Sequence, residues 1–167
     1  RQAGCTDPRG AAFRLWQPRR RPGAQLVNVP GTWNFSDLQT ADPPAATAFY
    51  VPLFGWEFDD VGFATMVRRP GYGNHLEATV HPDIRAVQSE AGAPPGFEDA
   101  VAWVTSGATE RWQVSFTVAD RDTSAEIAEN LGAAIVATED TLWTKTVTIR
   151  DPQGALLALS QFTPPGG

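Results

Sequence analysis

The sequence predicts an α+β fold in which one β-α-β-β-β module occurs twice. Two helix signals occupy matching places, because Asp42 stands thirteen residues before Gly55 and Asp120 stands twelve before Gly132. An aspartate cap at the start and a glycine just past the end are typical helix boundaries. A strand-like run precedes each signal, and further strand-like runs follow it. This internal repeat predicts two modules of one topology.

The first module is expected to begin with a strand over residues 32–40, in which alternate side chains share one face: Trp33, Phe35, Asp37 and Gln39. A helix follows over residues 42–55, and Pro52 should bend or shorten its last turn. Short strand runs and a turn at Asp59-Asp60 come next. The run "NHLEATVH" at residues 74–81 is predicted to be a further strand near the end of this module.

The second module is expected to follow an insertion. Residues 82–110 combine weak periodicity with several helix and strand breakers, which predicts an excursion or lid with one short helix. A strand over residues 112–120 opens the second module. A helix over residues 122–132 comes next, with Thr123 and Glu126 at the spacing of a capping box. Three strands complete the module: residues 133–138, 142–149 and 155–162.

Composition restricts the classes of function. The 167 residues favour one domain, and the fractions of 42% hydrophobic and 19% charged residues are ordinary for a globular chain. The net charge of −6 argues against non-specific nucleic-acid binding, and the arginine run at residues 19–21 is interpreted as a solvated linker. Cys5 is the single cysteine, so no internal disulfide or thiolate metal site is expected. Apolar runs are too short to cross a membrane, and we expect a cytoplasmic protein.

Three stretches of sequence resemble the vicinal oxygen chelate superfamily, which includes glyoxalase I, bleomycin-resistance proteins and extradiol dioxygenases. They are "DPPAATAFYVPLFGWEF", "VSFTVADRDTSAEIAENLGA" and "RDPQGALLALSQF". Together with the strand before the first stretch, they cover most of residues 32–162. The resemblance implies that the paired modules form a curved, partly closed mixed sheet around a cleft.

The chain also resembles bacterial members that carry two such domains in tandem. The turn phrase Asp-Pro-x-Gly, followed by a strand, occurs at Asp7 and again at Asp151. On this resemblance, residues 1–17 are the last strand of an upstream similar domain, residues 18–31 are a linker, and residues 32–167 are the domain itself. Its modules are then residues 32–81 and 111–162, with the insertion at 82–110. The alternative is that residues 1–17 add an edge strand to this same domain.

Enzymes of the superfamily hold a divalent metal with side chains from the first and last strand of each module, and this resemblance implies where such ligands would stand. Counting seven residues back from Asp42 and from Asp120 places the two first-strand positions at Phe35 and Gln113. A phenylalanine cannot bind a metal, whereas the amide oxygen of a glutamine can.

The last-strand positions are also poor in donors. Seven residues after Asp151 stands Ala158, and the same offset from Asp7 gives Arg14. The last-strand position of the first module is ambiguous from sequence. We therefore expect no cofactor, with a divalent metal as the alternative.

Weak candidates for an atypical metal site remain in the chain. His75, Glu77 and His81 would project to one face of a strand, and Gln113 could join them as a fourth ligand. A His-Glu pair could also act in general acid-base chemistry, although nothing in the sequence supplies a matched nucleophile. The alternative is a polar strand that faces solvent.

The turn "RRPGYG" offers candidates for binding an anion. Arg68, Arg69 and Tyr72 could hold a carboxylate or phosphate together with backbone N–H groups. The stretch lacks the spacing of a phosphate-binding loop, so a plain turn is the alternative.

These observations favour a protein that binds a small organic ligand, with an aromatic molecule favoured by the expected cleft lining. The candidate cleft residues are Trp33, Phe35, Asp37, Gln113, Ser115 and Ala158. One alternative is a metal-dependent lyase, isomerase or dioxygenase with an atypical ligand set, and another is a partner-binding subunit without catalysis. Whether the chain is an enzyme is left open. We expect no nucleic-acid or membrane partner, and a homodimer is compatible with the resemblance.

Overall fold

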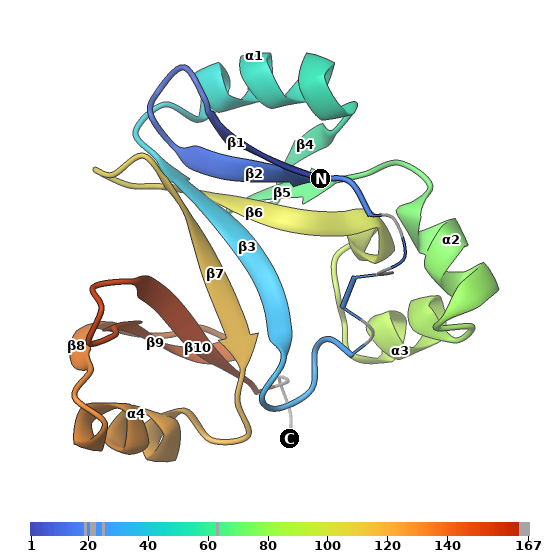
Figure 1. Cartoon of the computed structure of the whole chain (residues 1–167). Helices are drawn as coiled ribbons and strands as arrows, with labels where there is room; N and C mark the ends of the chain where they lie inside the picture. Colours follow the sequence, from blue (N-terminus) through green and yellow to red (C-terminus); the bar gives the residue numbers. More distant parts are fainter. Residues whose placement is uncertain (19, 21–22, 25, 63, 164–167) are drawn as a thin grey trace. The chain divides into compact units, whose positions relative to one another are not determined.

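The computed structural model describes residues 1–18, 20, 23–24, 26–62 and 64–163 (Figure 1). Within them the chain forms ten strands, four α-helices and one short 3-10 helix, η1 (Phe97–Asp99). The α-helices are α1 (Pro43–Phe54), α2 (Tyr72–Thr79), α3 (Ile84–Glu90) and α4 (Arg121–Asn130). The strands are β1 (Gln2–Thr6), β2 (Ala12–Trp16), β3 (Trp33–Thr40), β4 (Glu57–Asp60), β5 (Thr65–Arg68), β6 (Ala100–Ser106), β7 (Arg111–Thr117), β8 (Ala134–Asp140), β9 (Thr144–Arg150) and β10 (Leu156–Phe162).

The expected α+β class is confirmed, and the sheet is mixed. Eight strands pair in the order β4-β5-β6-β3-β7-β10-β9-β8, while β1 and β2 form a separate two-stranded sheet. β3 runs parallel to β6, and β7 runs parallel to β10. The order β-α-β-β-β occurs once from β3 to β6, interrupted by α2, α3 and η1, and once from β7 to β10. Within the described residues, no helix has the length and apolar character needed to span a bilayer.

The chain divides into two compact units. The first, called the Asp37 unit, comprises Ala3–Leu15 and Asp37–Trp112. The second, called the Gln113 unit, comprises Arg1–Gln2, Trp16–Ser36 and Gln113–Gly167.

The core of the Asp37 unit lies between α1 and one face of its strands. α1 begins as expected, because the Asp42 side chain accepts a hydrogen bond from the Ala45 N–H, and it ends at Gly55 with a positive φ of 66°. Its Tyr50 is fully buried against apolar side chains from three strands. Full burial of a valine or leucine side chain among them stabilises the fold by about 1.5–3 kcal/mol. These side chains are Leu38, Val67, Ala102 and Val104.

Residues 1–17 form a hairpin that packs on α1, whereas a turn followed by one strand was expected. In the turn, Asp7 Oδ1 accepts hydrogen bonds from the N–H groups of Arg9 and Ala11, both at 2.9 Å. Asp7 Oδ2 accepts a third bond from the Tyr50 hydroxyl at 2.9 Å, and Trp112 Nε1 donates to that hydroxyl at 2.9 Å. Burial is the main cause that raises the pKa of Tyr50. Residues 19, 21, 22 and 25 of the expected linker lie outside the described residues.

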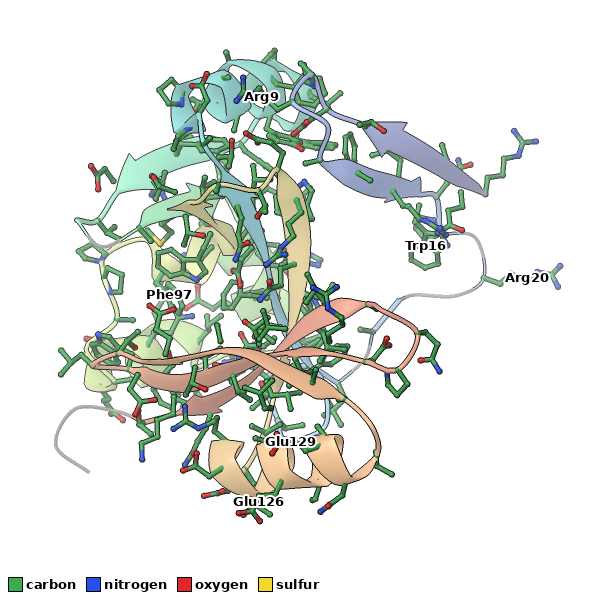
Figure 2. All side chains as sticks on the ribbon, turned by 90° about the vertical axis from the view of Figure 1, so that its left-hand side faces the viewer. Arg9, Trp16, Arg20, Phe97, Glu126 and Glu129 are labelled. Atoms are coloured by element: carbon green, nitrogen blue, oxygen red, sulfur yellow. The ribbon has the colours of Figure 1, made fainter. Side chains whose placement is uncertain are left out.

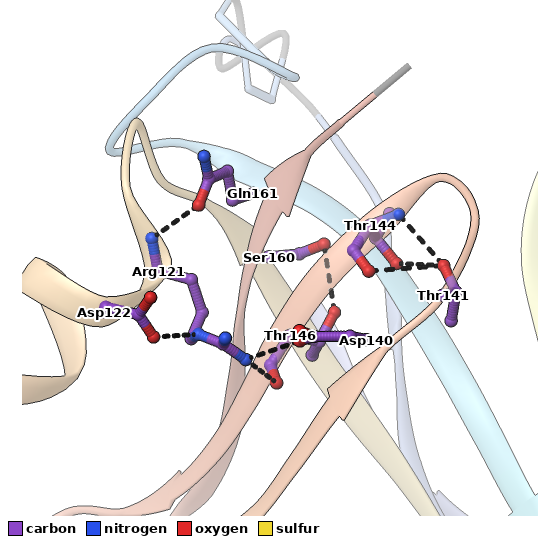
Figure 3. Close-up of polar contacts among 8 residues, drawn as sticks. All are labelled: Arg121, Asp122, Asp140, Thr141, Thr144, Thr146, Ser160 and Gln161. Carbon is purple, nitrogen blue, oxygen red and sulfur yellow. Dashed lines mark hydrogen bonds and ion pairs between the residues drawn. The ribbon is translucent and has the colours of Figure 1, made fainter. Parts of the chain in front are cut away.

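In the Gln113 unit, α4 is tied to the strands at its first residue. The Arg121 N–H donates to Gln161 Oε1 at 2.9 Å, and the Arg121 guanidinium binds Asp122, Asp140 and the Thr146 carbonyl (Figure 3). Gln161 shares its face of β10 with Leu157 and Leu159 by the alternation of a strand. This face therefore lies under α4. In Figure 2, Glu126 marks the outer side of α4.

Two expectations for residues 74–110 were wrong. Residues 74–79 belong to helix α2 and not to a strand, because the carboxylate of Asp99 accepts hydrogen bonds from the N–H groups of Gly71 and Gly73 at the start of that helix. The segment expected to be an excursion ends in β6, a strand that pairs with both β3 and β5. The one short helix expected in this segment is confirmed as α3, whereas the 3-10 helix η1 was not foreseen.

Candidate functional site

The Asp37 unit presents a row of four side chains on the sheet face opposite α1. The pairing register joins Asp37 to Trp103, Trp103 to Met66, and Met66 to Asp59 across β3, β6, β5 and β4. Their neighbours along each strand point into the core under α1, so these four point to the other side. We call this row, together with Phe97, the Asp37 face. Phe97, labelled in Figure 2, lies with its ring centroid 6.0 Å from that of Trp103.

The two carboxylates of the Asp37 face have different surroundings. Asp59 forms an ion pair with Arg68. Asp37 is part-buried beside Trp103, and its Oδ1 is buried without a hydrogen-bond partner among the described residues. Burial raises the pKa of Asp37 from 3.8 to about 7, because the charged form loses hydration and gains no compensating contact. A carboxyl group of this kind can donate or accept a proton near neutral pH.

The Gln113 unit holds the other polar candidates in a buried row. Ser115 pairs with Ala158, and Ala158 pairs with Thr148. Gln113 lies on the same face, because its Nε2 donates to Thr148 Oγ1 at 3.3 Å. Gln113, Ser115 and Ala158 are only 5%, 6% and 3% exposed. These side chains face away from α4 and are shielded from solvent.

The aromatic candidates of the Gln113 unit are more accessible. Trp33 is 37% exposed, and its ring centroid lies 6.4 Å from that of Phe35. The Trp33 indole N–H donates to Ser36 Oγ at 3.4 Å. Trp33 and Phe35 thus form an aromatic pair on the first half of β3.

The pairing register also settles the last-strand position that was ambiguous from sequence. In the second module Ala158 pairs with Ser115, five residues before the helix cap Asp120. In the first module the residue five before Asp42 is Asp37, and its partner on β6 is Trp103. Trp103 therefore occupies the position that corresponds to Ala158.

These positions do not fit a divalent metal of the design that the superfamily resemblance implies. Phe35, Trp103 and Ala158 offer no donor atom for coordination, so the amide oxygen of Gln113 is the one atom at these four positions that could bind a metal. In the part of the chain that the structure describes, no three His, Cys, Asp or Glu side chains are grouped so that they could hold a metal.

The histidine candidates lie on and beside α2 and not on a strand. His75 and Glu77 are two residues apart on the helix, so they point to different sides, and His81 follows the helix end. Glu77 forms an ion pair with Arg85 of α3. The sequence argument that placed the three side chains on one face therefore fails.

Most polar groups of the turn that was expected to bind an anion already contact other residues of the chain. Arg68 forms ion pairs with Glu57 and Asp59, and the Asp99 carboxylate engages backbone N–H groups at the start of α2. Arg69 and Tyr72 line a surface hollow of about 210 Å³ together with His75.

Sequence reasoning missed Trp103 and Met66. The alternation in "AVAWVTS" at residues 100–106, bounded by Gly96 and Gly107, was the signal that could have identified this strand. Met66 lies on a four-residue strand that is too short to show a clear period.

Comparison with known proteins identifies the family. A model of the glyoxalase-like domain matches residues 35–160, which is most of the chain. The chain belongs to the glyoxalase-like domain family. The expected membership of the vicinal oxygen chelate superfamily is thereby confirmed.

The glyoxalase-like domain has longer relatives. It is 30% identical over 169 residues to the protein named "Putative glyoxylase CFP32" of Mycobacterium bovis, covering 98% of this chain and 57% of that protein. It is also 30% identical over 157 residues to the anthracycline biosynthesis protein DauV of Streptomyces sp. strain C5, covering 93% of this chain and 50% of that protein. The chain thus spans about half the length of these relatives.

Two solved structures match parts of the chain weakly. Homoprotocatechuate 2,3-dioxygenase of Brevibacterium fuscum matches with a TM-score of 0.48 and 14% identity, over 78% of this chain and 36% of that one. The Mn(II)-bound glyoxalase of Novosphingobium aromaticivorans matches with a TM-score of 0.47 and 14% identity, over 81% of this chain and 41% of that one.

Proposed function

We propose that this glyoxalase-like domain binds a small, flat organic molecule against the Asp37 face, without the metal that the superfamily resemblance implies. The observation that carries the proposal is the residue type at the ligand positions. Phe35, Trp103 and Ala158 are residue types that do not coordinate a metal, whereas the positions that they occupy would need oxygen or nitrogen ligands. The curved, partly closed sheet around a cleft, inferred from the resemblance, remains part of this proposal.

The chemistry of the Asp37 face supports a flat organic ligand. The Trp103 indole offers a broad apolar surface that is partly exposed, with Phe97 beside it and Met66 next to it in the row. Aromatic side chains bind planar ligands through stacking and edge contacts, while Met66 is only 1% exposed and lies beside the indole as a buried neighbour. Asp37 supplies one polar group at the edge of this apolar surface, which is the usual composition of a small-molecule site.

Tryptophan fluorescence tests this proposal. We expect 1-naphthol to quench the fluorescence in a saturable way, because a bound ring would lie against Trp103. The Trp103→Phe variant should lose most of the saturable component. Trp143→Phe is the matched control, because Trp143 stacks on Phe162 at the edge of the Gln113 unit and should leave that component unchanged.

Two outcomes would contradict the proposal. Absence of saturable quenching by 1-naphthol and related planar aromatics would argue against a ligand on this face. Equal losses in the Trp103 and Trp143 variants would show that quenching does not report on the Asp37 face.

A further inference from the structure

Asp37 is an acceptor whose partner is missing from the described residues. Its Oδ1 is buried, and no described side chain or backbone group donates a hydrogen bond to it. A buried acceptor left in this state costs about 1–3 kcal/mol relative to one that is hydrogen-bonded. A molecule that supplies a donor to Asp37 therefore recovers free energy that the free protein lacks.

The other carboxylate of the Asp37 face does not share this state. Asp59 lies at the other end of the same row and is neutralised by Arg68. Between the two carboxylates stand Trp103 and Met66, neither of which can neutralise a carboxylate. Desolvation by burial raises the pKa of Asp37, and no positively charged side chain among the described residues contributes to the shift.

We infer that the molecule bound on the Asp37 face carries a hydroxyl or N–H group on its aromatic ring and donates a hydrogen bond from that group to Asp37. This inference rests on the proposed function and adds the chemical class of the ligand. The ring lies against Trp103, and the polar group meets the buried oxygen at the end of the row. A ring without a donor gains the apolar contact alone.

The single methionine of the chain makes a direct test available. Met66 is the only methionine and stands next to Trp103 in the row, so a ¹³C-methyl methionine label reports on this face. The label is followed by NMR during titrations with phenol and with toluene, which differ by a hydroxyl in place of a methyl group. We expect both to shift the Met66 methyl signal, with phenol about 5-fold to 10-fold tighter, as one added hydrogen bond implies.

Variants assign the preference to Asp37. Asp37→Leu removes the acceptor and should make the affinities for phenol and toluene equal. Asp37→Asn keeps a carbonyl acceptor and should retain part of the preference. Asp60→Asn removes one negative charge from an exposed position outside the Asp37 face and should leave the preference unchanged.

Each contrary result has a separate meaning. Equal binding of phenol and toluene by the wild type would overturn the inference and leave the proposed function standing. A phenol preference that survives in Asp37→Leu would overturn it as well. If neither compound moves the Met66 signal, the proposed function fails for this face, and the inference fails with it.

Discussion

Replacing Asp37 by asparagine should stabilise the domain at pH 8 and have little effect near pH 4. In the folded chain, burial raises the pKa of Asp37 from 3.8 to about 7. Between these two pH values the folded state holds a proton that the unfolded state has released. The free energy of unfolding of the wild type therefore falls as the pH rises from about 4 through about 7.

The size of this effect follows from the pKa difference. Each unit of pKa shift corresponds to about 1.4 kcal/mol. Above pH 7 the free energy of unfolding of Asp37→Asn should therefore be higher than that of the wild type by up to several kcal/mol. Urea unfolding of both proteins from pH 4 to pH 8 measures the difference. Asp60→Asn is the control for the loss of one negative charge, because Asp60 is exposed on the same unit. Parallel pH profiles for the wild type and Asp37→Asn would contradict the assigned environment of Asp37.

Replacing Asp7 by alanine should destabilise the domain far more than the same change at Asp151. Both aspartates stand in an Asp-Pro-x-Gly turn, and both accept two backbone hydrogen bonds within that turn. Asp7 is only 7% exposed and accepts a third bond from the Tyr50 hydroxyl, which is buried. Loss of Asp7 leaves that hydroxyl as a buried donor without its partner.

Thermal or urea unfolding compares the two variants. We expect Asp7→Ala to lower the free energy of unfolding by about 3–4 kcal/mol and Asp151→Ala to lower it by about 1–2 kcal/mol. Both variants lose the two hydrogen bonds of the turn, and Asp7→Ala also loses the bond to Tyr50. Tyr50→Phe combined with Asp7→Ala should cost less than the sum of the single changes, because both remove the same hydrogen bond. Equal costs at the two turns would show that the contact between Asp7 and Tyr50 contributes nothing.

Local signals in the sequence predicted the elements whose ends are set by nearby residues. Asp42 and Asp120 cap α1 and α4 through backbone groups three residues away, and Gly55 and Gly132 follow with positive φ values. These contacts lie within one turn of the chain. The positions of both helices and of the strands around them were therefore accessible from sequence alone.

Long-range contacts explain what the sequence did not reveal. The start of α2 is stabilised by Asp99, 26 residues beyond Gly73, so the pattern at residues 74–81 carried no sign of it. The place of β6 depends on pairing with β3, and this pairing identifies Trp103 as the counterpart of Ala158.

The candidate site was only partly foreseen for the same reason. Asp37 was a candidate because the alternation of the first strand places it on the same face as Trp33 and Phe35. Its buried oxygen and its raised pKa depend on neighbours from other strands, such as Trp103 on β6.

Binding of 1-naphthol with and without a chelator tests the central claim most directly. The affinity is measured by fluorescence titration in EDTA, and then again after removal of the EDTA and addition of Mn²⁺. Because Phe35, Trp103 and Ala158 supply no metal ligand, we predict the same dissociation constant under both conditions. Binding that disappears in EDTA and returns with Mn²⁺ would contradict the claim that this glyoxalase-like domain holds its ligand without a metal.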